Sequence, residues 1–315
     1  MAQNTTNTTA FIEAEQYSQF ILENLPDGML PDTFVRDVSD FDSGTTLNIK
    51  TVGTATIQDV AENQAITYNA IDTDTVTLSI TDYVGDGWYI TDLLRMDAAQ
   101  TEQLQAIRAK EATRALQEYY ETRFLAVCNS AQTASGANNV NGFAHRKVAS
   151  GTGQIITLGD FRDMKLSFDK ANVAQAGRVA IVDPVVEATL NGLVGAQAFT
   201  NNPMFGGLVN EGFARNHKFV ANIFGWDIYT SNRLATTASE TVSGVTVTGG
   251  VANVFMSVAD DHSKPIMSAW RQMPKAEGGR NRELKRDEFD VVGRFGLGAQ
   301  RVDTLGIVLT DSVTY

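Results

Sequence analysis

The sequence predicts an α+β fold in which an extended hairpin and one long helix accompany a compact α/β region. Two segments of alternating polar and apolar residues, at 45–52 and 75–81, flank a long polar stretch. Residues 97–131 contain neither glycine nor proline and carry apolar residues near the helical period. A short apolar strand at 178–182 leads directly into a helix that begins with a proline, which is typical of an α/β region.

The N-terminal segment begins with ten small or polar residues and continues into a predicted short helix over 11–25. A Pro-Asp-Gly turn at 26–28 ends this helix, and a second short element is expected over 31–38. The start has no basic region and no apolar core, which argues against a signal peptide and against removal of a long leader.

The two alternating segments are predicted to pair as an extended hairpin with one solvated face. Residues 53–74 between them are rich in Thr, Asn, Asp and Gln. A two-stranded ribbon is marginally stable in water, so this arm needs a partner surface. The candidates for that contact are the single apolar residues along it: Ile57, Val60, Ile66, Tyr68 and Ile71.

Residues 97–131 predict a rod of ~45 Å, which is long for a domain helix and indicates a strut. The face expected to be buried carries Leu104, Ile107, Ala112, Ala115, Leu116, Tyr119, Leu125 and Ala126. Cys128 follows in the same apolar context, which favours a buried structural thiol over a nucleophile. As the only cysteine, it also excludes an internal disulfide.

The compact region is predicted from 158 onward. A helix over 158–175 is followed by the apolar strand at 178–182, and Asp183 then caps a helix that begins at Pro184 and ends near Leu193. Strand-like segments follow at 225–230, 242–247, 252–258, 265–271 and 289–310, and 305–309 is a candidate buried strand.

Composition bounds the class of protein. Of 315 residues, 43% are hydrophobic and 20% are charged, which fits a globular chain with a core. The net charge of −12 should repel nucleic acid on average, so no DNA-reading surface is expected. No run approaches the ~20 apolar residues of a membrane-spanning helix.

No catalytic, cofactor or metal site is predicted. His145 lies beside two basic residues, and His217 has no acidic neighbour in sequence. Only His262 has carboxylates at hand, on Asp260 and Asp261, and a solvated turn explains these residues better than a metal or catalytic site.

Three glycines, Gly293, Gly296 and Gly298, are similar in content to a nucleotide-binding loop. Their order does not match the dinucleotide fingerprint, and no Lys-Ser/Thr pair follows them. We interpret them as bends or bulges in a strand pair.

One basic cluster stands out because acidic residues are interleaved with it. Mixed signs favour salt bridges between subunits over plain solvated surface, and over contact with phosphates, which would require fewer acids. The cluster comprises Lys275, Arg280, Arg282, Lys285 and Arg286.

The order of these elements resembles the Hong Kong 97 capsid fold, especially the major capsid proteins of short-tailed and marine phages. The resemblance spans nearly the whole chain and includes RVAIVDP at 178–184 and FGWDIY at 224–229. It implies an N-terminal arm, an E-loop hairpin, a P-domain with a spine helix at 97–131, an A-domain and a C-terminal return to the P-domain. The boundaries are 1–44, 45–82, 83–149, 150–262 and 263–315.

The resemblance implies hexamers and pentamers that close an icosahedral shell around double-stranded DNA. Scaffolding, portal and cement proteins are the implied partners, the location is the virion capsid after assembly in the host cytoplasm, and no membrane is involved. The N-terminal arm would contact neighbouring subunits through Phe11, Tyr17 and Phe20.

One departure concerns covalent crosslinking, which some relatives achieve through a lysine in the E-loop. Residues 51–74 contain no lysine, and Lys50 lies at the base of the hairpin. We therefore expect a shell without these crosslinks.

Three alternatives stay open at this point. An encapsulin-like nanocompartment would share the fold and enclose an enzyme cargo. A tail tube subunit would also have a long hairpin, but its fold is mainly β and lacks a helix of ~30 residues. An enzyme of unknown type would need a site that the sequence does not reveal.

Overall fold

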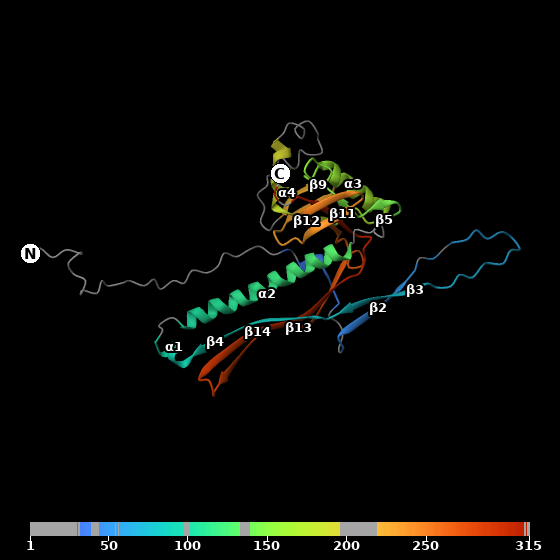
Figure 1. Ribbon diagram of the computed structural model, residues 1–315. Coiled ribbons are helices and arrows are strands. Elements are labelled where there is room, and N and C mark those ends of the chain that lie inside the picture. Colours follow the sequence, from blue (N-terminus) through green and yellow to red (C-terminus); the bar gives the residue numbers. More distant parts are fainter. Residues whose placement is uncertain are drawn as a thin grey trace, which may run out of the picture.

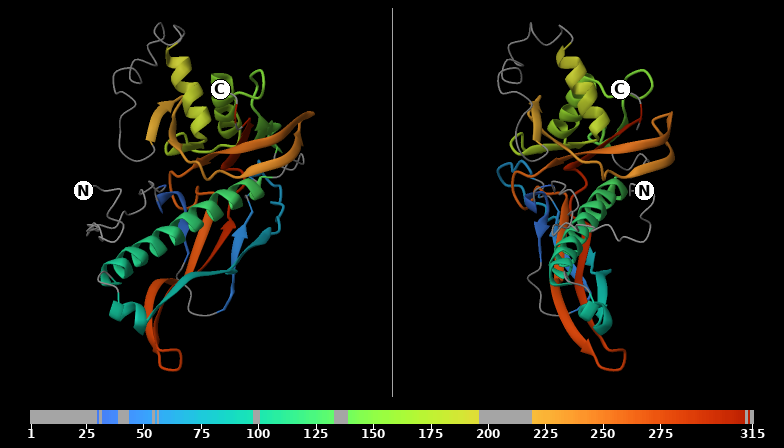
Figure 2. Two further views of the ribbon diagram at one scale, coloured as in Figure 1. Left: turned by 60° about the vertical axis from the view of Figure 1, so that its left-hand side comes forward. Right: turned by 90° about the vertical axis from the view of Figure 1, so that its left-hand side faces the viewer.

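The computed structural model describes residues 30, 32–38, 44–53, 55, 57–97, 101–132, 139–195, 219–311 and 313. It has an elongated lower part, a compact upper part and a thin hairpin arm that projects to one side (Figure 1). Helix α2 (Thr101–Ala131) runs diagonally between the lower and upper parts, as the two views of Figure 2 also show.

The elongated part is a four-stranded sheet in the order β1-β13-β14-β4. Strand β1 is parallel to β13, and the other pairs are antiparallel. The β13–β14 hairpin extends beyond the rest of the sheet (Figure 2). A short 3-10 helix, η1 (Asp32–Phe34), precedes the first of the four strands: β1 (Arg36–Asp37), β4 (Asp82–Thr91), β13 (Ile266–Asn281) and β14 (Arg286–Ala299).

Helix α2 confirms the predicted strut from residue 101 onward, with 31 residues. A separate short helix, α1 (Asp92–Asp97), precedes it. Ala112 and Leu116 pack against the four-stranded sheet at Val291. Leu125 and Cys128 are buried against the sheet of the compact upper part. One helix thus joins both parts of the molecule.

The predicted buried face of this helix is correct only in part. Ala112, Leu116 and Leu125 are buried, but Ala115 and Tyr119 are exposed. Cys128 is fully buried, and burial raises the pKa of its thiol, as expected for a structural cysteine.

The compact part is a seven-stranded sheet in the order β7-β15-β12-β8-β10-β9, with β11 paired to β12. Its strands are β7 (Arg146–Val148), β8 (Arg178–Val182), β9 (Phe219–Ile223), β10 (Trp226–Thr230), β11 (Thr236–Val242), β12 (Val245–Ser257) and β15 (Leu305–Thr310). A small separate sheet pairs β5 (Asn139–Val140) with β6 (Phe143–Ala144).

Both faces of this sheet are covered. Side chains of successive strand residues point to opposite faces, so Ala180 packs with helices α3 (Leu158–Lys170) and α4 (Pro184–Gly195), whereas Ile181 packs with the end of α2. Strand β8 is therefore buried along its whole length, as its apolar sequence predicts.

Strand β15 corrects one expectation. Residues 305–309 form the predicted buried strand, but it lies in the seven-stranded sheet between β7 and β12 rather than returning to the elongated sheet. All six of its residues are buried, and only a central strand covered on both faces accommodates such a run.

Two further boundaries differ from the sequence prediction. The helix expected over 158–175 ends at Lys170, because Asn172 adopts a left-handed conformation with φ of 58°. The segment at 242–247 is not one strand, since Ser243 and Gly244 turn the chain between β11 and β12 with φ of 50° and 83°.

Candidate inter-subunit interfaces

The base of the E-loop is anchored firmly to the elongated sheet. Strands β2 (Thr46–Val52) and β3 (Thr73–Ser79) pair antiparallel, as predicted from their alternation. Leu78 and Ile80 are buried against Met267 and Ala269 of β13. The hairpin therefore leaves the body from a packed root.

Gly293 lies opposite the register shift between Gln272 and Lys275, in agreement with its interpretation as a bulge position. Gly296 and Gly298 are instead required by the close approach of the hairpin root, which corrects their interpretation as bends or bulges. A Cβ on Gly296 would lie 2.5 Å from the carbonyl oxygen of Ser79, and one on Gly298 would lie 2.8 Å from Leu78. The register shifts of this strand pair flank Gln272, which is in β13. Glycine thus permits the end of β3 to cross β14 at close range.

The distal E-loop has almost no packing of its own. Beyond the last strand pair, the Gly53 amide donates to the Asp72 carbonyl at 2.8 Å, and Gln58 exchanges two hydrogen bonds with the backbone of Thr67. The five apolar residues singled out in the sequence are all exposed, with exposed fractions of 94% for Ile57, 59% for Val60, 54% for Ile66, 95% for Tyr68 and 77% for Ile71.

These exposed apolar side chains make the arm a candidate interaction surface. The arm projects well away from the body, so these side chains cannot be covered by the chain's own core (Figure 1).

The basic cluster lies around the β13–β14 hairpin and forms ion pairs within the chain. Arg280 binds both carboxylate oxygens of Asp92 at 2.6 Å and also contacts Asp287 at 3.1 Å. Lys275 pairs with Glu277 at 2.8 Å, and Arg286 with Glu288 at 2.7 Å. Arg282 and Lys285 are exposed at the hairpin tip. A contact of this cluster with a neighbouring subunit stays a prediction.

Part of this network fastens α1 to the hairpin. The Asp92 amide donates to the Lys285 carbonyl at 3.1 Å, and Arg95 pairs with Asp287. The hydrogen bonds from Arg280 are the main cause that lowers the pKa of both Asp92 and Asp287.

Helix α1 carries a second exposed apolar surface that sequence reasoning missed. Leu93 and Met96 are 73% and 80% exposed, and Leu284 at the hairpin tip is 58% exposed. They lie at the opposite end of the molecule from the E-loop (Figure 1). The sequence signal that could have revealed this surface is a Leu-Leu pair and a methionine within an otherwise polar short helix.

A buried carboxylate joins three segments of the chain. Glu121 of α2 accepts hydrogen bonds from the Leu30 amide at 3.2 Å and from the Ser231 hydroxyl at 2.7 Å. Arg233 pairs with Glu121 at 3.5 Å and with Glu118 at 3.0 Å. The end of the N-terminal segment and the loop after β10 are thereby held to the spine helix.

The two histidines that the structure describes, His145 and His262, do not lie in a group of potential metal ligands. His145 is fully buried and stacks on Phe168, with ring centroids 5.5 Å apart. The Ser263 amide donates to Asp260 at 2.7 Å, and Lys264 pairs with Asp261 at 2.7 Å. Hydrogen bonds from Ser263 are the main cause that lowers the pKa of Asp260, and the hydrogen bond from Lys264 is the main cause that lowers the pKa of Asp261. In the described ranges, no three His, Cys, Asp or Glu side chains are grouped to hold a metal.

Several predicted residues lie outside the described residues. They are Phe11, Tyr17, Phe20 and His217. Within the described part of the chain, no helix has the length and apolar character needed to cross a membrane.

This architecture, with its projecting hairpin, long spine helix and two sheets, is the Hong Kong 97-like capsid fold. Solved structures support the assignment. The capsid of cyanophage P-SCSP1u matches with a TM-score of 0.73 at 15% identity, covering 98% of this chain and 94% of that one. The mature capsid of bacteriophage PhiM1 matches with a TM-score of 0.69 at 12% identity, covering 99% and 96%. A structure from Mycobacterium phage Che8 matches with a TM-score of 0.65 at 16% identity, covering 96% of this chain and 98% of that one.

The model of the phage capsid protein family matches residues 72–310, and the chain belongs to this family. No curated protein matches the sequence. The protein is a major capsid protein, a structural component of the virion that forms a shell from copies of itself. Neither the tail tube nor the nanocompartment alternative is favoured.

Proposed function

We propose that this protein assembles as hexamers and pentamers into an icosahedral shell that encloses double-stranded phage DNA. The observation that carries the proposal is the E-loop. It is packed at its root and bare along its length, and its five apolar side chains are more than half exposed. Such an arm becomes stable when it lies across a neighbouring copy.

The expected energetics favour a closed lattice. Covering one exposed isoleucine or an aromatic side chain such as Tyr68 is worth about 1.5–3 kcal/mol. Each contact is modest, but a closed shell repeats it in every subunit, which makes dissociation multivalent and slow.

The charge of the chain is compatible with a shell that binds its DNA only weakly. The chain carries a net charge of −12. Several basic side chains near the hairpin are already occupied by carboxylates, among them Arg280, Lys275 and Arg286. A chain with net negative charge would keep the shell from binding its DNA tightly, so that the DNA can slide during packaging and ejection.

The proposed partners follow from this role. Assembly in the host cytoplasm would begin as a precursor shell around a scaffolding protein, with DNA entering through a portal protein at one vertex. A cement protein is the further partner expected where hairpin crosslinks are missing.

Electron microscopy of the purified protein, expressed alone and with a candidate scaffolding protein, tests the proposal. Closed icosahedral particles or hexameric and pentameric rings support it, and packaged DNA rather than enzyme cargo separates a phage shell from a nanocompartment. A stable monomer or dimer under both conditions contradicts it.

A further inference from the structure

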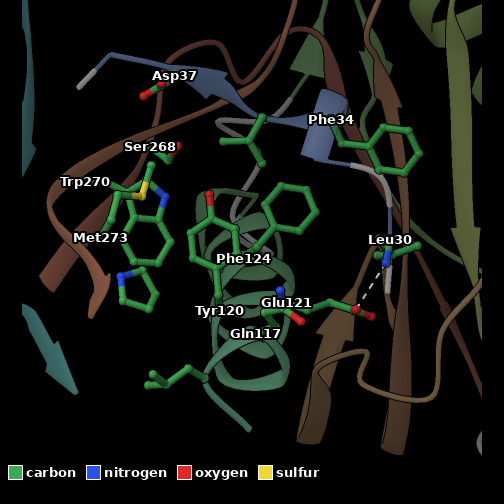
Figure 3. Close-up of a pocket in the computed structure, with 13 residues that line it drawn as sticks. Leu30, Phe34, Asp37, Gln117, Tyr120, Glu121, Phe124, Ser268, Trp270 and Met273 are labelled. Carbon is green, nitrogen blue, oxygen red and sulfur yellow. Dashed lines mark hydrogen bonds between the residues drawn. The ribbon is translucent and has the colours of Figure 1, made fainter. Parts of the chain in front are cut away.

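An apolar groove lies beside the spine helix where the described chain begins. It has a volume of about 690 Å³ and is formed by residues of α2 and β13 together with Leu30, Phe34, Val35 and Asp37. Tyr120 and Phe124 of α2 lie between Trp270 and Met273 on one side and Leu30 on the other, and the Phe34 ring lies on the side of Leu30 (Figure 3).

Tyr120 and Trp270, which line the groove, belong to an aromatic cluster. The rings of Tyr120 and Trp270 stack with centroids 5.2 Å apart, and both contact Phe295. The register shifts around Gln272 place Met273 at the rim, where its side chain is 62% exposed. A cavity of this size accommodates several apolar side chains, since sites for drug-sized molecules span about 300–1,000 Å³.

We infer that the N-terminal segment of the same chain, residues 11–25, docks in this groove. The chain enters the described structure at the groove itself, because Leu30 lines it and its amide is held by Glu121. Only residues 26–29 separate Leu30 from the predicted helix, and their Pro-Asp-Gly turn favours a reversal of direction.

The pattern of this segment fits one apolar side facing a groove. On a helical projection, six apolar residues, Phe11, Ala14, Tyr17, Ile21, Leu22 and Leu25, fall within an arc of about 140°, whereas Ile12 and Phe20 lie outside it. The acidic residues Glu13, Glu15 and Glu23 lie outside that arc. Glu23 would thereby face away from Asp37 and Glu121 of the groove, and Glu13 and Glu15 would lie at the edges of the arc.

The short connection favours the same chain over a neighbour as donor. A flexible linker of a few residues gives an effective concentration in the millimolar range, which exceeds that of a free subunit in solution. The inference assigns Tyr17 to a contact within the chain. Phe20 lies about 130° from the centre of the apolar arc and stays available for a neighbouring subunit.

Cysteine crosslinking of the full chain tests this docking. Ile21→Cys and Met273→Cys place one thiol on the apolar arc and one on the exposed rim, and a short bismaleimide then joins them if they are close. Cys128 does not compete, because it is fully buried and its thiol pKa is raised. The matched control pairs Ile21→Cys with Ala115→Cys, an exposed position on the other side of α2.

We expect a crosslink within single chains, seen as a mobility shift without a dimer band, formed about tenfold faster than in the control pair. A crosslinked dimer means that a neighbour's segment fills the groove, and equal rates mean that nothing docks there. Either result overturns the inference. Hydrogen exchange of residues 11–25 in the unmodified chain gives a second reading, and exchange at the rate of a free peptide also overturns it. Neither the crosslinking nor the hydrogen exchange depends on shell formation. A failure of this inference can therefore be distinguished from a failure of the proposed function, on which the inference does not rest.

Discussion

Arg178 is a charged residue that the fold holds almost entirely away from water. Its side chain is 1% exposed and pairs with Asp169 at 2.6 Å. It also donates to the carbonyls of Val173 and Ala174, and its guanidinium lies over the rings of Phe168 and Trp226. One side chain therefore ties the end of α3 to the start of β8.

We predict that Arg178→Ala lowers the free energy of unfolding by about 3 kcal/mol. Removing one partner of a buried pair typically costs about 3–5 kcal/mol, and the lower end applies because Asp169 is one-third exposed. The matched control is Arg162→Ala, whose pair with Asp163 is on the surface and should cost under ~1 kcal/mol. Urea unfolding measures both, and equal effects would show that Arg178 is not a structural anchor.

Contacts such as those of Arg178 and Glu121 are hard to predict from sequence. Glu121 is bound by residues 91 and 110 positions away. In sequence, Glu121 is an ordinary charged residue of a mixed helix, and Arg178 is a single basic residue at the start of an apolar strand. The burial that gives them structural meaning arises only when the sheets and the spine helix pack together.

At the scale of elements, the ion pairs of Arg280 hold α1 against the β13–β14 hairpin. These contacts lower the folded-state pKa values of Asp92 and Asp287 below the unfolded values. Their stabilisation is therefore fully present above the unfolded pKa of about 3.9 and is lost as pH falls through the folded values.

We predict that α1 detaches in acid, below about pH 4, while the core is retained. Hydrogen exchange of α1, corrected for the intrinsic rate at each pH, measures this. Arg280→Gln should loosen α1 already at neutral pH. Lys275→Gln is the control, since Lys275 pairs with Glu277 on its own strand and should leave α1 protected. An α1 that is equally protected in all three proteins would contradict the anchoring role.

For the E-loop, we predict that substitutions change assembly rather than folding. Tyr68→Ser should strongly reduce particle yield without changing the unfolding midpoint of the isolated subunit, because Tyr68 is 95% exposed. Asn69→Ser, at the neighbouring exposed position, should assemble normally. Particle yield by sedimentation and urea unfolding make the comparison, and a Tyr68 variant that assembles like the control would remove the E-loop from the interface.

The elements that sequence predicted well are those with a simple period. Alternation identified β2 and β3, helical spacing identified α2, and apolar runs identified β8 and β15. Strand β4 was missed, because Gly85 and Gly87 interrupt its pattern, and because one of its faces is exposed while most of the other is only half-buried. The full length of the β13–β14 hairpin was hidden by its charges, since both strands run past the core into solvent.

At the scale of the whole molecule, the exposed apolar surfaces were predicted in part. The exposure of the E-loop residues was predicted because isolated apolar residues in a polar arm have no internal partner, and their contact with a neighbouring subunit stays a prediction. The α1 surface was missed, because its exposure depends on where α1 is anchored. The groove beside α2 was missed for a similar reason, since it is made by three segments distant in sequence.

We predict that shells of this protein dissociate completely into single chains in hot detergent. The distal E-loop, residues 51–74, contains no lysine that could form an isopeptide bond. Denaturing electrophoresis of purified particles should therefore show a band at 34.2 kDa. A ladder of covalent multimers would contradict this expectation.

The central claim is that the bare E-loop is completed by a neighbouring copy in a closed shell. A cryo-electron microscopy reconstruction of assembled particles tests it most directly. The account predicts hexamers and pentamers in which Ile57 and Tyr68 are buried against the adjacent subunit. A closed shell in which these side chains stay in solvent, or no shell under any assembly condition, would contradict it.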